Sequence, residues 1–226
     1  MREKTDFKSA GKIVTLYPAR QPGAPMIILN NFSGDGSSVV SAMEEIGCGD
    51  CYLASIGNLN WDHDMTPWYC PALSPNDKPC TGGADAYLNL LLGQILPDTL
   101  SRISGRPAFL GIAGYSLGGL FALYSMYHTD RFSRAASMSG SFWFPDFVEY
   151  AQSHDLKRRP ERLYISMGDS EAKTRNKLLK KVQENTEILI GLYREKGIPV
   201  EYQLNSGNHF KEPALRSAKG IKAILL

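Results

Sequence analysis

The chain has 226 residues, of which 43% are hydrophobic and 21% charged, and its 25 Lys and Arg against 23 Asp and Glu leave a formal net charge of +2. This composition is typical of a globular protein, and the balanced charge argues against a nucleic-acid partner. No apolar run reaches the roughly 18 residues of a membrane span, and the charged start lacks the apolar stretch of a secretion signal. We therefore expect a single cytoplasmic domain over residues 1–226 that does not bind membranes.

Short apolar runs alternate with longer amphipathic ones along the chain. The short runs predict strands at residues 12–16, 26–30, 51–56, 108–113, 134–139, 162–167 and 200–205. The longer runs predict helices at residues 37–46, 84–103, 117–127, 173–195 and 213–226. Pro97 falls inside the second of these helices and should kink or divide it. The alternation favours an α/β fold with a mostly parallel central sheet and helices on both faces.

Residues 60–83, NWDHDMTPWYCPALSPNDKPCTGG, break this alternation with four prolines and little periodicity. We interpret them as a long irregular loop, a feature that in compact domains is often functional. Its tryptophans favour an ordered wall over a binding site. The segment 145–160 is too short for more than a small cap, so we expect a minimal cap or none.

The motif Gly114-Tyr-Ser116-Leu-Gly118-Gly119 follows a predicted apolar strand and opens a predicted apolar helix. A Gly-x-Ser-x-Gly motif in this context predicts a nucleophile elbow, in which the serine projects from a tight turn and the glycines avoid clashes. The absence of a Gly-Lys-Ser/Thr ending disfavours a phosphate-binding loop. Ser116 is therefore the predicted nucleophile.

A serine nucleophile needs a base, and the base needs an orienting acid. In the elbow fold the order is serine, acid, histidine, which selects His209 on the loop after the last predicted strand. The acid is expected on the loop after the sixth strand, where Asp169 and Glu171 compete. One of them could instead stabilise the start of the following helix. The residues alone do not separate the two.

The oxyanion of an acyl-transfer reaction needs two backbone donors. Leu117, directly after the nucleophile, supplies one by position. The second is expected from the glycine-containing loop after the strand at 26–30, and we assign it to the N–H of Phe32.

Four cysteines, Cys48, Cys51, Cys70 and Cys80, are too few for a disulfide scaffold. Cys48 and Cys51 have the spacing of a zinc or redox motif, but nine residues separate Cys70 from Cys80. We expect unliganded thiols, with structural zinc and a disulfide as alternatives, and we expect no metal and no cofactor.

At these residues the chain resembles the α/β-hydrolase superfamily, and within it the esterase family that includes enterochelin esterases, esterase D-like enzymes and bacterial feruloyl esterases. Besides GYSLGG, the resemblance rests on a Thr-Pro-Trp loop ending at Trp68, on GGADAYL, on MSGSFWF with its Trp143, and on GNHF. It covers nearly the whole chain. By similarity the family's acid lies three residues after the glycine that closes the sixth strand, which implies Glu171. Feruloyl esterases carry His-Gly where this chain has Asn30-Asn31, a departure at the expected oxyanion loop.

The resemblance implies a serine carboxylesterase that acts on a small-molecule ester through an acyl-enzyme. Trp68 and Trp143 are the predicted substrate-binding walls, because aromatic faces suit a planar acyl group, with core packing as the alternative for each. Siderophore, aryl and short-chain esters all fit. An acyltransferase using the same acyl-enzyme, and a non-catalytic binding protein on this scaffold, are the competing hypotheses.

Overall fold

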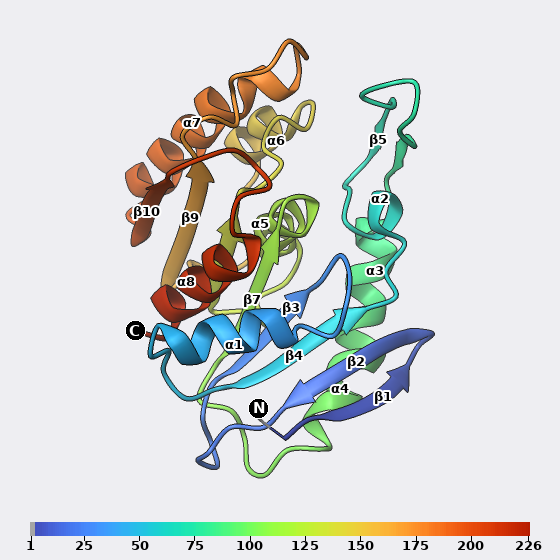
Figure 1. Cartoon of the computed structure of the whole chain (residues 1–226), viewed down its shortest axis with the longest axis vertical. Helices are drawn as coiled ribbons and strands as arrows, with labels where there is room; N and C mark the ends of the chain where they lie inside the picture. The colour runs from blue at the N-terminus through green and yellow to red at the C-terminus, as the bar shows by residue number, and fades with distance from the viewer. Residues whose placement is uncertain (1–2) are drawn as a thin grey trace.

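The computed structural model describes residues 3–226, and its centre is an eight-stranded sheet (Figure 1). The strand order is β1-β2-β4-β3-β7-β8-β9-β10. The pairs β1–β2 and β2–β4 are antiparallel, and all other neighbours are parallel. The strands are β1 (Thr5–Ser9), β2 (Lys12–Tyr17), β3 (Met26–Asn30), β4 (Tyr52–Gly57), β7 (Leu110–Tyr115), β8 (Arg134–Met138), β9 (Arg162–Gly168) and β10 (Val200–Asn205). The predicted mostly parallel α/β architecture is confirmed.

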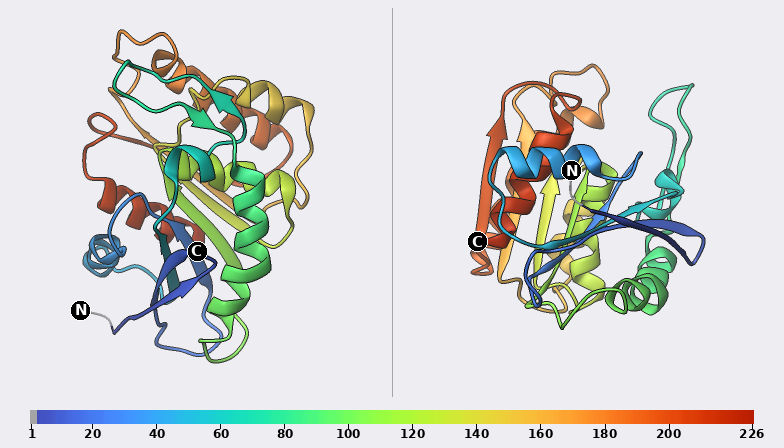
Figure 2. Two further views of the ribbon diagram at one scale, coloured as in Figure 1. Left: turned by 90° about the vertical axis from the view of Figure 1, so that its right-hand side faces the viewer. Right: turned by 60° about the horizontal axis from the view of Figure 1, so that its bottom comes forward.

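Helices cover both faces of this sheet (Figure 2). One face carries α1 (Ser37–Glu45) and α8 (Pro213–Leu225), and the other carries α3 (Ala84–Leu90), α4 (Leu96–Leu100), α5 (Leu117–His128), α6 (Phe147–Ser153) and α7 (Val182–Glu195). Side chains alternate along β3, so that Met26 and Ile28 pack under α3 and α5, whereas Ile27 and Leu29 pack under α1 and α8. The strand is buried on both faces because helices cover both, which explains why its sequence is apolar throughout.

Several predicted elements have different bounds in the structure. The edge strand β1 was not predicted, because its sequence TDFKS has no clear apolar pattern. The helix expected over residues 84–103 runs without a break from α3 through the π-helical segment η1 (Leu91–Ile95) into α4 and ends at Leu100, with helical backbone angles at both junctions. Pro97 therefore does not split it; the π-helical segment directly precedes the proline, which has no N–H to donate. The helix expected to begin at residue 173 begins only with the 3₁₀ turn η2 (Leu179–Lys181) and α7.

Residues 58–83 form a strap beside the carboxyl ends of the parallel strands (Figure 1). The strap is less irregular than predicted, since it contains the short helix α2 (Trp61–Asp64) and a hairpin of β5 (Tyr69–Cys70) and β6 (Cys80–Thr81). Asn176 ties it to the segment before α7 by donating from its side-chain amide to Leu73 O at 3.1 Å. Between β8 and β9 the only helix is α6, so this segment carries at most a small cap. The strap is therefore the main segment beside the carboxyl ends of the parallel strands.

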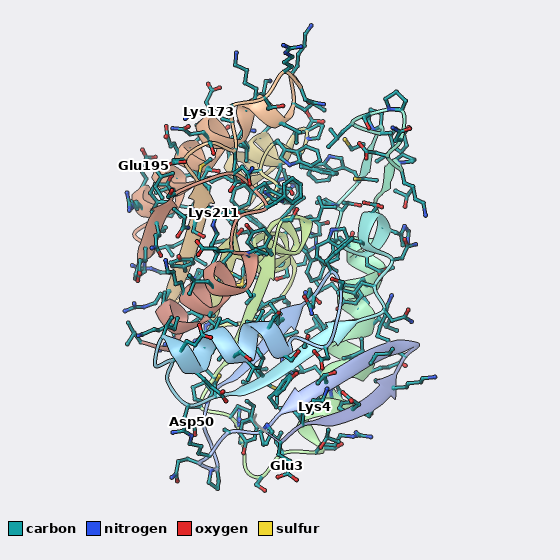
Figure 3. All side chains as sticks on the ribbon, viewed as in Figure 1. Glu3, Lys4, Asp50, Lys173, Glu195 and Lys211 are labelled. Atoms are coloured by element: carbon teal, nitrogen blue, oxygen red, sulfur yellow. The ribbon has the colours of Figure 1, made fainter. Side chains whose placement is uncertain are left out.

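Charged side chains such as Lys173, Glu195 and Lys211 are exposed (Figure 3). Over residues 3–226, no helix combines the length and the apolar character that crossing a membrane requires.

Candidate active site

Ser116 occupies a strained turn between β7 and α5, with φ 58° and ψ −124°. The two glycines on either side of it explain how this turn closes. A Cβ on Gly114 would lie 2.2 Å from Gly118 O, and one on Gly119 would lie 2.7 Å from Ser137 Oγ. The turn therefore has the geometry of a nucleophile elbow, and the N-terminus of α5 points its positive end at the serine.

The Ser116 hydroxyl begins a hydrogen-bonded chain of three side chains. His209 Nε2 lies 3.0 Å from Ser116 Oγ, and His209 Nδ1 lies 2.9 Å from Glu171 Oε2. The residues come from the ends of three parallel strands, β7, β9 and β10, which meet at one edge of the sheet. Because Nδ1 faces a carboxylate, it carries the ring proton and leaves Nε2 free to accept one from the serine.

Glu171, and not Asp169, is the carboxylate that reaches His209. Asp169 Oδ1 accepts a hydrogen bond from Gly207 N at 2.9 Å. This side chain therefore fastens the loop after β10 that carries His209 (the histidine loop) to the loop after β9 that carries Glu171 (the acid loop). A Cβ on Gly168 would lie 2.1 Å from Gly207 O, which shows how closely the two loops approach. The alternative that the sequence left open is thus decided by which side chain faces the imidazole.

The Glu171 side chain is 3% exposed and keeps its charge because it is surrounded by donors. Its Oε1 accepts from Gly168 N at 2.6 Å and from Ser139 Oγ at 2.8 Å. Burial alone would raise the pKa of the Glu171 carboxyl, but the hydrogen bonds from His209, Gly168 and Ser139 hold this pKa below its ordinary value. The carboxyl is therefore ionised at neutral pH and can orient the imidazole.

Arg216 of α8 is a buried cation that sequence reasoning missed. Its side chain is 2% exposed, and Nη1 lies 3.2 Å from Glu171 Oε1. The same guanidinium donates to Ser139 Oγ at 3.1 Å, to Tyr115 OH at 3.3 Å and to Ser206 O at 3.1 Å. One side chain thus joins the acid loop, the residue before the nucleophile and the histidine loop.

Tyr115 completes this network from the other side of the serine. Its hydroxyl donates to His209 O at 2.7 Å, and burial raises the pKa of the phenol, which keeps it protonated and able to donate. The backbone of the histidine loop is thereby held at both Ser206 and His209.

The two residues predicted to supply the oxyanion donors each line a cavity that also contains Ser116. Leu117 is the first residue of α5, so its N–H has no acceptor within the helix. Phe32 lies on the loop after β3 and lines a cavity together with Ser116. The preceding N–H, that of Asn31, donates to Ile56 O at 3.0 Å, and the Asn31 amide donates to Ser33 O at 2.8 Å, so this asparagine shapes the loop.

A further hydroxyl lies beside Ser116. Ser141 Oγ is 3.3 Å from Ser116 Oγ, and Ser141 N donates to Ser116 O at 3.1 Å. Ser141 is 1% exposed and belongs to the turn after β8. The MSGSFWF motif had marked this segment, but not the place of Ser141 against Ser116.

The structure separates the two tryptophans predicted to bind substrate. Trp143 lines the cavity that contains Ser116. Trp68 lies outside the linings of both cavities at the serine: its indole N–H donates to Pro145 O at 2.9 Å and its ring packs against Phe144 and Tyr150, as in the core-packing alternative. Trp61 of α2, which the sequence did not single out, lines both cavities instead.

Of the four cysteines, Cys80 lines the cavity that contains Ser116 and Trp143. Cys70 and Cys80 are register partners in the β5–β6 hairpin, and burial raises the pKa of both thiols, that of Cys80 to about 12. Within residues 3–226 no disulfide bond joins any two cysteines, and no three His, Cys, Asp or Glu side chains gather in a way that could hold a metal ion.

Comparisons with known proteins find a matching family, a related sequence and similar folds. The model of the family described as "Putative esterase" matches residues 55–211, which include Ser116, Glu171 and His209. "Uncharacterized protein YbbA" of Bacillus subtilis (strain 168) is 25% identical over 209 residues, 85% of this chain and 82% of that protein.

Two solved structures share the fold. An IroE-like serine hydrolase from Shewanella oneidensis superposes with a TM-score of 0.79 at 16% identity, covering 97% of this chain and 79% of that one. The siderophore hydrolase EstB from Aspergillus nidulans gives a TM-score of 0.74 at 17% identity, covering 97% and 93%. With the family model spanning well over half of its length, the chain belongs to the "Putative esterase" family and is an esterase with the α/β-hydrolase fold.

Proposed function

We propose that this esterase is a serine carboxylic-ester hydrolase that acts through a Ser116–His209–Glu171 triad. The observation that carries the proposal is the continuous hydrogen-bonded chain from Glu171 Oε2 through the imidazole to Ser116 Oγ, with distances of 2.9 and 3.0 Å. A nucleophile, a base and an orienting acid in hydrogen-bond contact are what acyl transfer to a serine requires.

The geometry supports a two-step reaction. Ser116 Oγ attacks the ester carbonyl carbon while His209 Nε2 takes the hydroxyl proton, and the carbonyl oxygen becomes an oxyanion beside the N–H groups of Leu117 and Phe32. Collapse expels the alcohol, which leaves with the proton from Nε2. Water then attacks the acyl-enzyme by the same route and releases the free acid. Glu171 holds the imidazole in the required tautomer and stabilises its charged form.

The proposed substrate is a small-molecule carboxylic ester. Siderophore esters are candidates because one structural neighbour is described as a siderophore hydrolase, and aryl or short-chain esters fit the same chemistry. No cofactor is needed for any step.

The first test is intact-mass analysis after treatment with a fluorophosphonate, which reports an activated serine without knowledge of the substrate. We expect a single adduct that maps to Ser116 and disappears in Ser116→Ala, while the exposed-helix control Ser153→Ala is labelled like the wild type. An unlabelled but folded wild-type protein would contradict the proposal and favour a binding role.

The choice of acid is tested by comparing Glu171→Gln with Asp169→Asn. Loss of the orienting acid lowers kcat about 10⁴-fold in serine proteases, and we expect a loss of that order for Glu171→Gln alone. Asp169→Asn removes the charge but keeps an Oδ1 that can accept from Gly207 N, and it should cost far less. Product analysis in the presence of an added alcohol separates hydrolysis, which yields free acid, from acyl transfer, which yields a new ester.

A further inference from the structure

Ser116 stands where two cavities meet, and each is large enough for a substantial group. One has a volume of about 370 Å³ and the other about 420 Å³, and both contact Ser116 and His209. Each volume alone falls within the usual range of about 300–1,000 Å³ for ligand pockets. An ester cleaved at this point can therefore extend in two directions from its carbonyl carbon.

Trp61 lies where the two cavities meet. It belongs to both linings, its ring meets that of Phe32 edge to face at 5.3 Å, and a Cβ on Gly118 would lie 3.0 Å from its Cη2. The strap thus inserts an indole directly above the nucleophile elbow. Phe32 and Phe210 are 71% and 84% exposed at the mouth, so apolar surface is presented to an incoming ligand instead of being buried in the core.

The two cavities differ in charge. The smaller one, between the strap and the start of α7, is lined by apolar side chains such as Leu73 and Val182 and carries Asp62, Asp77 and Lys78. The larger one lies between the loop after β3, α1 and the start of α8. Among the described residues, its lining has no Asp, Glu, Lys or Arg. Apart from Tyr115 and the base His209, which sit at the Ser116 end, it consists of apolar side chains with serines and asparagines. An ionised group placed in the rest of this cavity would lose hydration without gaining an oppositely charged partner.

We propose that the substrate class is an ester with a bulky group on each side of the ester bond, of which the group in the larger cavity is uncharged. This inference rests on the proposed serine-hydrolase function. It disfavours esters with a small acyl or alcohol part, since these leave one cavity unfilled and forgo the burial that would raise kcat/KM.

The test is a set of four alkyl esters of matched intrinsic reactivity: ethyl acetate, ethyl 3-phenylpropanoate, 2-phenylethyl acetate and 2-phenylethyl 3-phenylpropanoate. We expect kcat/KM for the doubly bulky ester to exceed that of each singly bulky ester by about tenfold or more, the effect of filling an apolar pocket. Equal kcat/KM for the doubly bulky ester and either singly bulky one would overturn the proposal.

Two variants show which cavity binds the acyl part of the ester and which binds the alcohol part. Ser38→Trp fills the larger cavity from an exposed position, and Leu73→Trp fills the smaller one from the strap. Each variant should abolish the preference for a phenyl group on one side of the ester and keep it on the other. Ser38→Trp and Leu73→Trp should affect opposite sides. If both variants impair the same side, the two-cavity assignment is wrong.

Charge provides the last comparison. A carboxylate added to the phenyl ring on the side sensitive to Ser38→Trp should lower kcat/KM about tenfold or more relative to the matching carboxamide, and equal rates would refute an uncharged subsite. Fluorophosphonate labelling of Ser116 is run on every variant in parallel. A labelled enzyme without the two-sided preference refutes this inference alone, whereas an unlabelled wild type refutes the proposed function itself.

Discussion

Replacing Arg216 by methionine tests whether one buried cation holds the site together. The substitution keeps an unbranched side chain but removes the guanidinium from Glu171, Ser139, Tyr115 and the carbonyl of Ser206. Glu171 is 3% exposed, so its carboxylate would remain buried without a cation. Removing one partner of a buried ion pair costs about 3–5 kcal/mol, a large part of a typical stability of about 5–15 kcal/mol.

The loss of unfolding free energy in Arg216→Met is limited, because the Glu171 carboxyl can take up a proton instead of staying charged. Without Arg216 the pKa of Glu171 should rise, and each unit of that rise corresponds to about 1.4 kcal/mol. The rate of fluorophosphonate labelling of Ser116 should then fall at a higher pH in the variant than in the wild type as the solution is acidified. Denaturant unfolding gives the stability change, and the pH profile of labelling gives the effect on the acid.

Arg216→Lys and Arg158→Met serve as controls. Lysine keeps the charge but lacks the planar fork that reaches four acceptors, so an intermediate effect is expected. Arg158 pairs with Glu161 at 2.8 Å on the surface, and such pairs contribute about 0–1 kcal/mol. If Arg216→Met unfolds within about 1 kcal/mol of the wild type and its labelling profile does not move, the proposed role of Arg216 is refuted.

Three further predictions follow from individual side chains. The folded pKa of Glu171 lies below 4.5, so its charge stabilises the fold above that pH, and the stability advantage of the wild type over Glu171→Gln should be constant near neutrality and shrink below pH 4.5 in denaturant titrations; an advantage that grows on acidification would contradict the sign. Gly168→Ala places a Cβ 2.1 Å from Gly207 O and should be strongly destabilising, whereas Gly191→Ala within α7 meets nothing within 4 Å and should stabilise by about 0.5–1 kcal/mol; similar thermal shifts for both would refute this. Trp68→Phe should lower the unfolding midpoint by removing the bond to Pro145 O, with kcat/KM unchanged, and a tenfold loss of kcat/KM would return Trp68 to the substrate site.

Features that depend on neighbours in the chain were readable from the sequence. The apolar runs predicted the parallel strands because strands covered on both faces bury every side chain. The elbow at Ser116 followed from glycines on either side of a serine between a strand and a helix. His209 followed from the order of the elbow fold, because parallel strands bring their carboxyl ends to one edge.

Contacts between distant segments were decided only by the tertiary structure. Asp169 and Glu171 are two residues apart, and only the approach of the histidine loop shows that Glu171 faces the imidazole while Asp169 binds Gly207 N. Arg216 lies in an amphipathic helix, where the sequence alone indicates a surface cation. Only the packing of α8 against the acid loop shows that it is buried. Trp61 and Trp68 share one irregular segment whose path is set by packing rather than periodicity, so only the structure shows that Trp61 lines the cavities at Ser116 whereas Trp68 packs against Phe144 and Tyr150.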